Sequence, residues 1–272
     1  MLSVAGDFAA AGFAEMVIKA IYGSSGRDQI HCKGGQLREG QRGWLQKIIQ
    51  QQGEVVVEPW LQKAVDLSLH FDVGAEGAVQ VRGWTRFITD DRGQYRSALI
   101  GQVAAGLNVE LMKFFYGDGR DPRRLSKVGS ALAAFLAGPL AKAGYRGPAG
   151  VDTLVYRDGA DLKLKPIVEI NPRMTMGRVA LELRRMVNSA RTGLWLVLSR
   201  REVEAVGFAG LTDCAQHLQA KYPARLMPDG KQLSEGVVFT TDPSQARSFA
   251  TVLLVGESLD QCRGYLTEAG LR

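Results

Sequence analysis

Cysteine and histidine are scarce in this sequence, with three residues of each among 272. Cys32, Cys214 and Cys262 are far apart and odd in number, so the sequence indicates neither a disulfide framework nor a CxxC-type zinc site. Free thiols fit a reducing compartment, and we therefore expect a cytoplasmic protein. The histidines show no useful spacing to a cysteine or an aspartate, and a Gly-x-Ser-x-Gly elbow is lacking, so a nucleophilic triad is not indicated.

Long apolar runs are lacking as well. The most apolar stretch, SALAAFLAGPLAKAGY at 130–145, is interrupted by Gly138 and Pro139 and is too short to cross a bilayer. We expect it to form a buried helix. The N-terminus has no basic segment, and Asp7 interrupts its small residues, so we expect neither a signal peptide nor a membrane partner.

Negative charge is in modest deficit, with 28 Asp and Glu against 34 Lys and Arg and a net charge of +6. The basic residues are spread along the chain, which favours small anionic molecules over nucleic acid as partners. The four tryptophans are scattered, so a base-stacking platform is not indicated either. Because 46% of the residues are hydrophobic, the chain can bury a sizeable core in one large domain or two small ones.

The hydrophobic pattern predicts alternating strands and helices. Strands are expected at 15–22, 54–61, 65–73, 79–89, 94–101, 150–156 and 162–171, with a hairpin turn at DDRG (90–93). Helices are expected over 37–51, 123–143, 176–190 and 193–206, and 105–117 shows no clear pattern. Shorter elements follow from about residue 207, where we place a boundary.

The stretch VEINPRMTMG (168–177) puts Glu169 and Asn171 two residues apart in an apolar run. If the preceding turn centres near 160–161, Asp152 lies opposite Glu169, and alternation puts these three side chains on one face. Two carboxylates at cross-strand distance repel unless a cation neutralises them, and Mg²⁺ takes one or two carboxylates together with substrate phosphates. The polar outer face of a hairpin is an equally open alternative.

Two earlier segments fit a nucleotide. Lys19 lies on an apolar strand just before the loop GSSG (23–26), whose backbone N–H groups could cradle phosphate oxygens. The strand VVVEPWL (55–61) runs into a stiff segment that offers backbone groups to a planar base, and Asp66 could accept hydrogen bonds from a ribose. Taken singly, each segment is equally well explained as an ordinary turn or strand end.

In this order, the segments resemble the ATP-grasp superfamily over about residues 13–190, through KAIYGSSGR, VVVEPWL, GVD and above all EINPR. The resemblance implies an α+β ATP-grasp fold, in which two α+β subdomains clasp a nucleotide. It places this domain at 1–206, with a phosphate-loop subdomain at about 13–60 and a metal-binding subdomain at about 61–206. A small C-terminal α/β extension would occupy 207–272.

The resemblance also implies a role for each site residue. ATP would be held by Lys19 at the α- and β-phosphates, by Ser24, Ser25 and Gly26 over the triphosphate, by Glu58 and the backbone of Trp60 and Leu61 at the adenine, and by Asp66 at the ribose. Mg²⁺, or Mn²⁺, would be bound by Asp152, Glu169 and Asn171. Arg173 would act with Lys19 in catalysis and steady the phosphate or an acyl-phosphate.

The implied activity is ADP-forming ligation of a small-molecule carboxylate to an amine or a thiol, through an acyl-phosphate. Such phosphoryl transfer needs charge neutralisation and positioning more than covalent help from the protein. Arg82, Arg86 and Arg96 lie on the hairpin around DDRG, and Arg86 and Arg96 could hold a substrate carboxylate. For any one of these arginines, a solvated strand face is the more ordinary explanation.

The sequence departs from the family pattern at two places. Family members usually carry an α/β lobe before the strand with the lysine, whereas 18 residues precede Lys19 here, and Asp28 stands where a glycine is expected. These departures leave an alternative open: a non-catalytic or truncated ATP-binding module, or one subunit of a split ligase. A partner chain would then supply the lobe, and a homo-oligomer is also compatible with the sequence.

Overall fold

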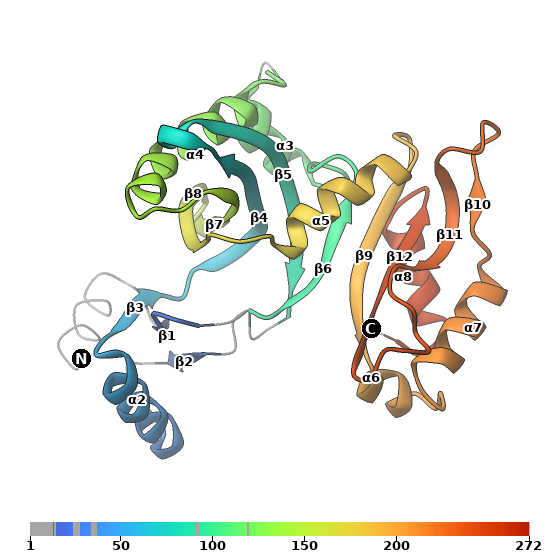
Figure 1. Ribbon diagram of the computed structural model, residues 1–272, viewed down its shortest axis with the longest axis horizontal. Coiled ribbons are helices and arrows are strands. Elements are labelled where there is room, and N and C mark those ends of the chain that lie inside the picture. The colour runs from blue at the N-terminus through green and yellow to red at the C-terminus, as the bar shows by residue number, and fades with distance from the viewer. Residues whose placement is uncertain are drawn as a thin grey trace. The chain divides into compact units, whose positions relative to one another are not determined.

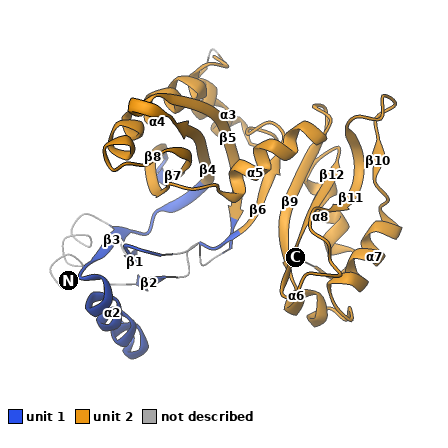
Figure 2. Ribbon diagram, viewed as in Figure 1, with its two compact units in different colours: residues 1–64, 89–95, 156–161 blue, residues 65–88, 96–155, 162–272 orange. Residues whose placement is uncertain are grey.

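The computed structural model describes residues 13, 15–23, 28–33, 37–90, 93–118 and 120–271. They form helices and antiparallel sheets, which confirms the predicted α+β class (Figure 1). The chain divides into two compact units (Figure 2). Unit 1 comprises the described residues of Met1–Ala64, Thr89–Tyr95 and Tyr156–Asp161, and unit 2 those of Val65–Ile88, Arg96–Val155 and Leu162–Arg272.

Unit 1 is a three-stranded sheet with one helix. The strand order is β2 (Gln29–Lys33), β1 (Glu15–Ala20) and β3 (Val55–Pro59), and both pairs are antiparallel. Alternation along β1 sends Met16 and Ile18 to one face, where they form a core with Cys32 and with Leu45 of helix α2 (Glu39–Gln52). Lys19 therefore points to the opposite face.

Unit 2 is built on a nine-stranded sheet. Across the sheet the strands are β10 (Arg225–Leu226), β11 (Leu233–Phe239), β12 (Phe249–Gly256), β9 (Thr192–Ser199), β6 (Tyr95–Ile100), β5 (Val79–Thr89), β4 (Gln62–Val73), β7 (Gly147–Asp158) and β8 (Asp161–Asn171). The sequence predicted the hairpin that β7 and β8 form, and this hairpin positions the candidate site.

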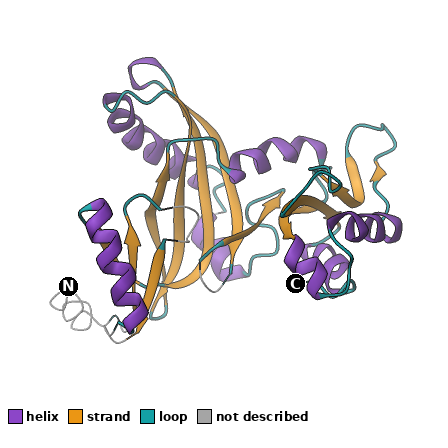
Figure 3. Ribbon diagram, turned by 60° about the horizontal axis from the view of Figure 1, so that its bottom comes forward, coloured by secondary structure: helices purple, strands orange, loops and turns teal. Residues whose placement is uncertain are grey.

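Helices lie against this sheet (Figure 3). The part without a clear pattern contains α3 (Val109–Tyr116), which Asn108 caps by accepting a hydrogen bond from Leu111 N–H. The next helix, α4 (Arg124–Lys142), approaches β5 closely, because Trp84 Nε1 donates to the Leu125 carbonyl and a Cβ at Gly129 would lie 2.7 Å from that nitrogen. None of the helices in the described part of the chain is long and apolar enough to span a membrane.

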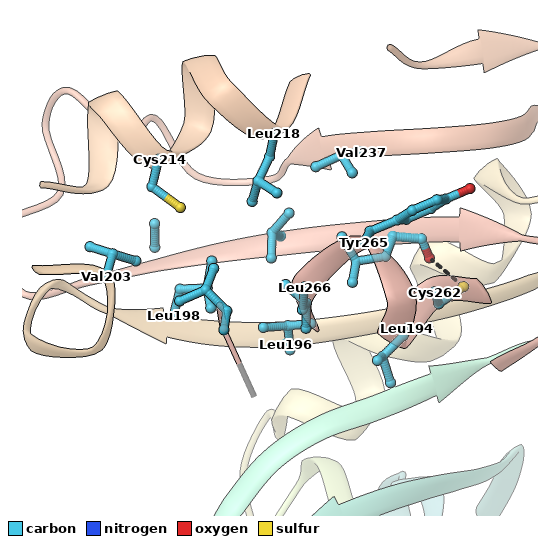
Figure 4. Close-up of a cluster of buried hydrophobic side chains, with 14 of the residues drawn as sticks. Leu194, Leu196, Leu198, Val203, Cys214, Leu218, Val237, Cys262, Tyr265 and Leu266 are labelled. Atoms are coloured by element: carbon cyan, nitrogen blue, oxygen red, sulfur yellow. Dashed lines mark hydrogen bonds between the residues drawn. The ribbon is translucent and has the colours of Figure 1, made fainter. Parts of the chain in front are cut away.

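A large apolar core surrounds β9, β11 and β12 together with α6 (Arg200–Ala205), α7 (Leu211–Lys221) and α8 (Leu259–Thr267) (Figure 4). Its fully buried members include Val203, Cys214, Leu218, Val237 and Cys262. The core therefore contains residues from both sides of position 207, and a domain boundary there stays a prediction.

The helix predicted over 193–206 is wrong for most of its length. Thr192–Ser199 forms β9, which pairs with β12 on one side and β6 on the other, and the helix α6 covers only Arg200–Ala205. The stretch GLWLVL (193–198) is apolar throughout because its strand is covered on both faces, and such a short run does not distinguish a strand from a buried helix. The helix predicted over 176–190 is also shorter, with α5 at Met176–Leu183 followed by one turn of 3₁₀ helix at Arg184–Met186.

Candidate functional site

Three carboxylates of unit 2 lie close enough to influence one another. Asp66 is on β4, Asp152 on β7 and Glu169 near the end of β8. The pKa of Asp152 is raised to about 7, chiefly by burial and also by the negative charges of Glu169 and Asp66. A hydrogen bond with Ser68 and the positive charge of Arg173 act in the opposite direction. Burial therefore makes a second negative charge at Asp152 costly, and a cation placed there would offset that cost.

Asn171 connects this acidic cluster (Asp66, Asp152 and Glu169) to Arg173. Its Nδ2 donates to Asp152 Oδ2 at 3.3 Å, and its Oδ1 accepts from Arg173 Nη2 at 2.8 Å. The Asn171 side chain is buried, whereas Glu169 is exposed. The three residues predicted as metal ligands thus lie together, and the predicted phosphate-binding arginine is bonded to one of them.

The donor set of the cluster suits a hard divalent cation. Carboxylate and amide oxygens are the ligands that Mg²⁺ prefers, and it commonly uses one or two protein carboxylates while substrate phosphates and water complete its shell. No group of three or more His, Cys, Asp or Glu that could hold a metal occurs among the residues that the structure describes. A metal at Asp152 and Glu169 would therefore depend on the Asn171 amide, a phosphate or water for its remaining ligands.

A buried histidine holds the segment that follows Asn171 against the sheet. His70 on β4 is 1% exposed; its Nε2 lies 2.7 Å from Thr85 Oγ1 and its Nδ1 lies 3.3 Å from Thr175 Oγ1. Burial, with the charge of Arg178, lowers the pKa of His70 to about 3, so the ring is neutral. Thr175 also caps α5 by accepting from Arg178 N–H at 3.1 Å. His70 therefore fixes the start of the helix that follows the EINPR motif.

An ion-pair network reinforces this anchor. Asp72 accepts from Arg178 Nη1 at 2.7 Å and lies 2.5 Å from Arg82 Nη2, which joins α5 to β4 and β5. The helix also comes very near His70, because a Cβ at Gly177 would lie 2.5 Å from the ring Nε2. The glycine of RMTMG is therefore a packing requirement.

His70, Asp72 and Thr175 were not predicted as site residues. The available signal was the stretch DLSLHFD (66–72), in which polar residues alternate strictly with apolar ones. Alternation places Asp66, Ser68, His70 and Asp72 on one face of β4, in line with their contacts to Asp152, Thr175 and Arg178.

In unit 1, the structure joins the two residues predicted at the phosphate and the adenine. Lys19 Nζ lies 2.6 Å from Glu58 Oε2, with both side chains between one fifth and one quarter exposed. The Trp60 N–H donates to the Glu15 carbonyl at 2.9 Å, so this residue can offer adenine its carbonyl or its ring but not its N–H. Leu61 follows directly on the way to β4.

Two aromatic rings of unit 1 pack against each other. The rings of His31 and Trp60 have centroids 4.4 Å apart, and His31 Nε2 lies 2.7 Å from a Glu15 carboxylate oxygen. The predicted triphosphate loop, Ser24, Ser25 and Gly26, lies outside the described residues.

The two arginines considered for a substrate carboxylate do not share a partner. Arg96 on β6 pairs with Glu202 of α6. Arg86 on β5 is buried, which excludes the solvated strand face that was the alternative for it.

No protein-family model matches the sequence, and no curated protein is significantly similar to it. Solved structures do resemble the fold. One is N5-carboxyaminoimidazole synthetase from Staphylococcus aureus complexed with ADP, at a TM-score of 0.56 and 10% identity over 99% of this chain. Another is biotin carboxylase from Campylobacter jejuni in an ATP-type complex, at 0.51 and 12% over 96% of this chain.

A third similar structure is the biotin carboxylase domain of 2-oxoglutarate carboxylase from Hydrogenobacter thermophilus, complexed with MgADP, ADP and bicarbonate. Its TM-score is 0.53 and its identity 14% over 97% of this chain. The chain spans 64% of the first of these proteins and 58% of the other two. The chain therefore has the ATP-grasp fold in partial form, which confirms the fold expected from the sequence.

Proposed function

We propose that this chain is an ATP- and Mg²⁺-dependent ligase, or the catalytic portion of one, that releases ADP and activates a small carboxylate for attack by an amine or thiol. The observation that carries the proposal is the acidic cluster at Asp152, linked through Asn171 to Arg173. The ATP-grasp fold supports it, as do the similar structures, a synthetase with bound ADP and a biotin carboxylase domain with bound MgADP.

In this proposal, the residues of unit 1 recognise the nucleotide. Lys19 would neutralise the α- and β-phosphates, and Glu58 with the backbone at Trp60 and Leu61 would hold the adenine. Since Lys19 forms an ion pair with Glu58, the phosphates would compete with that carboxylate for the ammonium group. Ser24, Ser25 and Gly26, which lie outside the described residues, remain our prediction for the loop over the triphosphate.

The residues of unit 2 would organise the reacting phosphate. Asp152, Glu169 and Asn171 would hold Mg²⁺, which neutralises the charge that spreads over phosphoryl oxygens during transfer. The Arg173 guanidinium would place a further positive charge there and orient the Asn171 oxygen to which it donates. The contact between His70 and Thr175 would keep this segment in place. Asp66, predicted at the ribose, lies near enough to Asp152 to act on the metal-binding carboxylates as well.

In the proposed reaction, all bonds that form and break belong to ATP and the two substrates. A carboxylate oxygen of the substrate attacks the γ-phosphorus of ATP, the bond to the β–γ bridging oxygen breaks, and ADP leaves with that electron pair. The nitrogen or sulfur of the second substrate then attacks the acyl carbon, phosphate leaves, and the attacking atom loses a proton.

The alternative function is an ATP-binding module without catalysis, or one subunit of a split ligase. It is motivated by the partial span of the chain relative to the similar structures, at 58–64% of their length. A partner chain that supplies further acceptor contacts belongs to this alternative. Binding of ATP without any ADP release, across a panel of carboxylates and amines, would favour it.

Titration calorimetry of ATP into the chain, with and without Mg²⁺, tests the proposal. We expect Mg²⁺-dependent binding that is lost in Lys19→Ala and Glu169→Ala. The matched controls are Lys47→Ala on α2 and Glu204→Ala on α6, because both side chains are exposed. Unchanged binding in Glu169→Ala would remove the metal assignment, and no ATP binding by the folded chain would remove the ligase assignment for this polypeptide.

A further inference from the structure

Arg86 carries a buried positive charge that the proposed reaction does not use. It lies on β5 and is 7% exposed. Its guanidinium has five N–H donors, and its one hydrogen bond to the described residues runs from Nη1 to the Val103 carbonyl at 3.2 Å. Within the described ranges, no carboxylate forms an ion pair with it. A buried charge is costly unless it is paired, so an anion bound at Arg86 would be favourable.

A second arginine lies near the first. Burial lowers the pKa of Arg86, and the positive charge of Arg263 lowers it further. Arg263 is exposed on α8, and it too has no ion-pair partner in the part of the chain that the structure describes. Ile88, two residues beyond Arg86 on β5, packs against the core that contains Cys262 and Leu266 of α8. The positive charge of Arg263 is therefore near enough to act on Arg86, and the packing of Ile88 brings this part of β5 to the core that contains α8.

This pair is separate from the acidic cluster. In the register of β4 and β5, Arg86 faces Leu67, while Asp66 faces Phe87. Cross-strand partners share a face and successive residues alternate, so Arg86 is on the face opposite to Asp66 and the other polar residues of β4. An anion at Arg86 would not be the phosphate that reacts at Asp152.

We propose that Arg86 and Arg263 form a binding site for a small oxyanion, a carboxylate or a phosphate, on the opposite face of the sheet from the acidic cluster. A guanidinium presents two parallel N–H groups that match a carboxylate or phosphate bidentately. Arg86 supplies this buried fork, and Arg263 closes the site from α8. The site gives the C-terminal segment a ligand-binding role that the proposed ligase reaction leaves unassigned.

The rival explanation is that Arg86 only supports the loop at Val103. One neutral carbonyl compensates a buried guanidinium poorly, and a neighbouring cation makes the position less favourable still. The two explanations differ in what Arg86→Met does. Loss of a structural hydrogen bond lowers stability, whereas removal of an uncompensated buried charge leaves stability in anion-free buffer unchanged or raises it.

The test is thermal unfolding of the full chain without nucleotide or Mg²⁺, with phosphate or acetate added at constant ionic strength. The Nε–Hε signals of the arginines are followed by NMR in the same titrations. We expect either anion to raise the unfolding temperature of the wild type and to shift the Arg86 signal. Phosphate alone or acetate alone would support the site and identify the oxyanion that it takes.

The variants separate this site from other sources of anion binding. Arg86→Met should abolish the response, and Arg263→Gln should weaken the affinity about two- to fivefold, as expected for an exposed charge. Arg201→Gln, at an exposed arginine of α6, is the matched control and should keep the wild-type response. The response should also persist in Lys19→Ala, which excludes phosphate bound at the proposed nucleotide site.

A loss of stability in Arg86→Met in anion-free buffer would favour the rival explanation, and three further results would overturn the proposal. The first is a wild-type chain that responds to neither anion in unfolding temperature or NMR. The second is a response that survives in folded Arg86→Met. The third is a response that disappears in Lys19→Ala. None of these results depends on whether the chain hydrolyses ATP, so a failure of the proposed ligase function would be recognised separately.

Discussion

The clearest test of the contact between His70 and Thr175 is how the free energy of unfolding depends on pH. His70 is 1% exposed, and its two ring nitrogens face Thr85 and Thr175. Burial holds its pKa at about 3 in the folded protein, below the ordinary 6.5. Between these values the unfolded chain binds more protons than the folded chain, so the free energy of unfolding falls as the pH is lowered from about 6.5 toward 3.

The magnitude follows from the two pKa values. The difference between 6.5 and about 3 corresponds to about 5 kcal/mol in total, at 1.36 kcal/mol for each pH unit. Carboxylates also titrate over most of the pH range between 6.5 and 3. The pH range in which His70 can be observed is therefore narrower. Between pH 6.5 and pH 4.5, His70 should remove about 2 kcal/mol of stability.

The perturbation is His70→Gln, which keeps a polar side chain but cannot take up the proton. Denaturant unfolding of wild type and variant at pH 4.5, 5.5 and 6.5 gives their difference in free energy of unfolding. We expect the wild type to lose about 2 kcal/mol more than the variant over this range. His217→Gln, at an exposed histidine of α7, is the control and should follow the wild type.

If the free energies of unfolding of the wild type and His70→Gln changed with pH in parallel, the low pKa of His70 would be refuted. This result would mean that His70 is protonated in the folded protein at an ordinary pH, and hence that the ring is not enclosed by the sheet and α5. The variant can be less stable than the wild type at every pH without affecting the test. Only the way in which the difference between their free energies of unfolding changes with pH reports on protonation of His70.

Further predictions concern packing and nucleotide recognition. Gly177→Ala should cost about 1–3 kcal/mol of stability in denaturant unfolding, because its Cβ would lie 2.5 Å from His70 Nε2, whereas Gly43→Ala, with open space around it in α2, should add about 0.5–1 kcal/mol. Lys19→Met should weaken calorimetric binding of ATP by at least about tenfold and leave adenosine binding nearly unchanged. Glu58→Gln should weaken adenosine binding; equal losses for ATP and adenosine in Lys19→Met would contradict the phosphate role.

The sequence was most informative where one strand carried chemistry at regular spacing. Glu169 and Asn171 stand two residues apart in an apolar run, and the predicted hairpin brings Asp152 to the same place. The alternation of side chains along each strand is enough to predict that these residues lie together, since it fixes which residues share a face. The partial ATP-grasp form also followed from the short motifs, although overall identity to the similar structures is only 10–14%.

The sequence was least informative where tertiary contacts decide. The run at 193–198 is apolar at every position, so its burial between β12 and β6 could not be distinguished from burial as a helix. The hydrogen bond of Arg86 to the Val103 carbonyl, 17 residues away in the chain, is likewise not revealed by any local pattern. His70 belongs to the same class, because its partner Thr175 is 105 residues away.

Strand β4 joins the two parts of the proposed metal site. Ser68 bonds to Asp152, and His70, on the same face, contacts Thr175. The free-energy effects of Ser68→Ala and His70→Gln should therefore not add when Mg²⁺-dependent ATP binding is measured, since residues within one network couple by about 0.5–3 kcal/mol. Additive effects would mean that the strand only supports two independent contacts, and that His70 stabilises α5 without positioning the metal ligands.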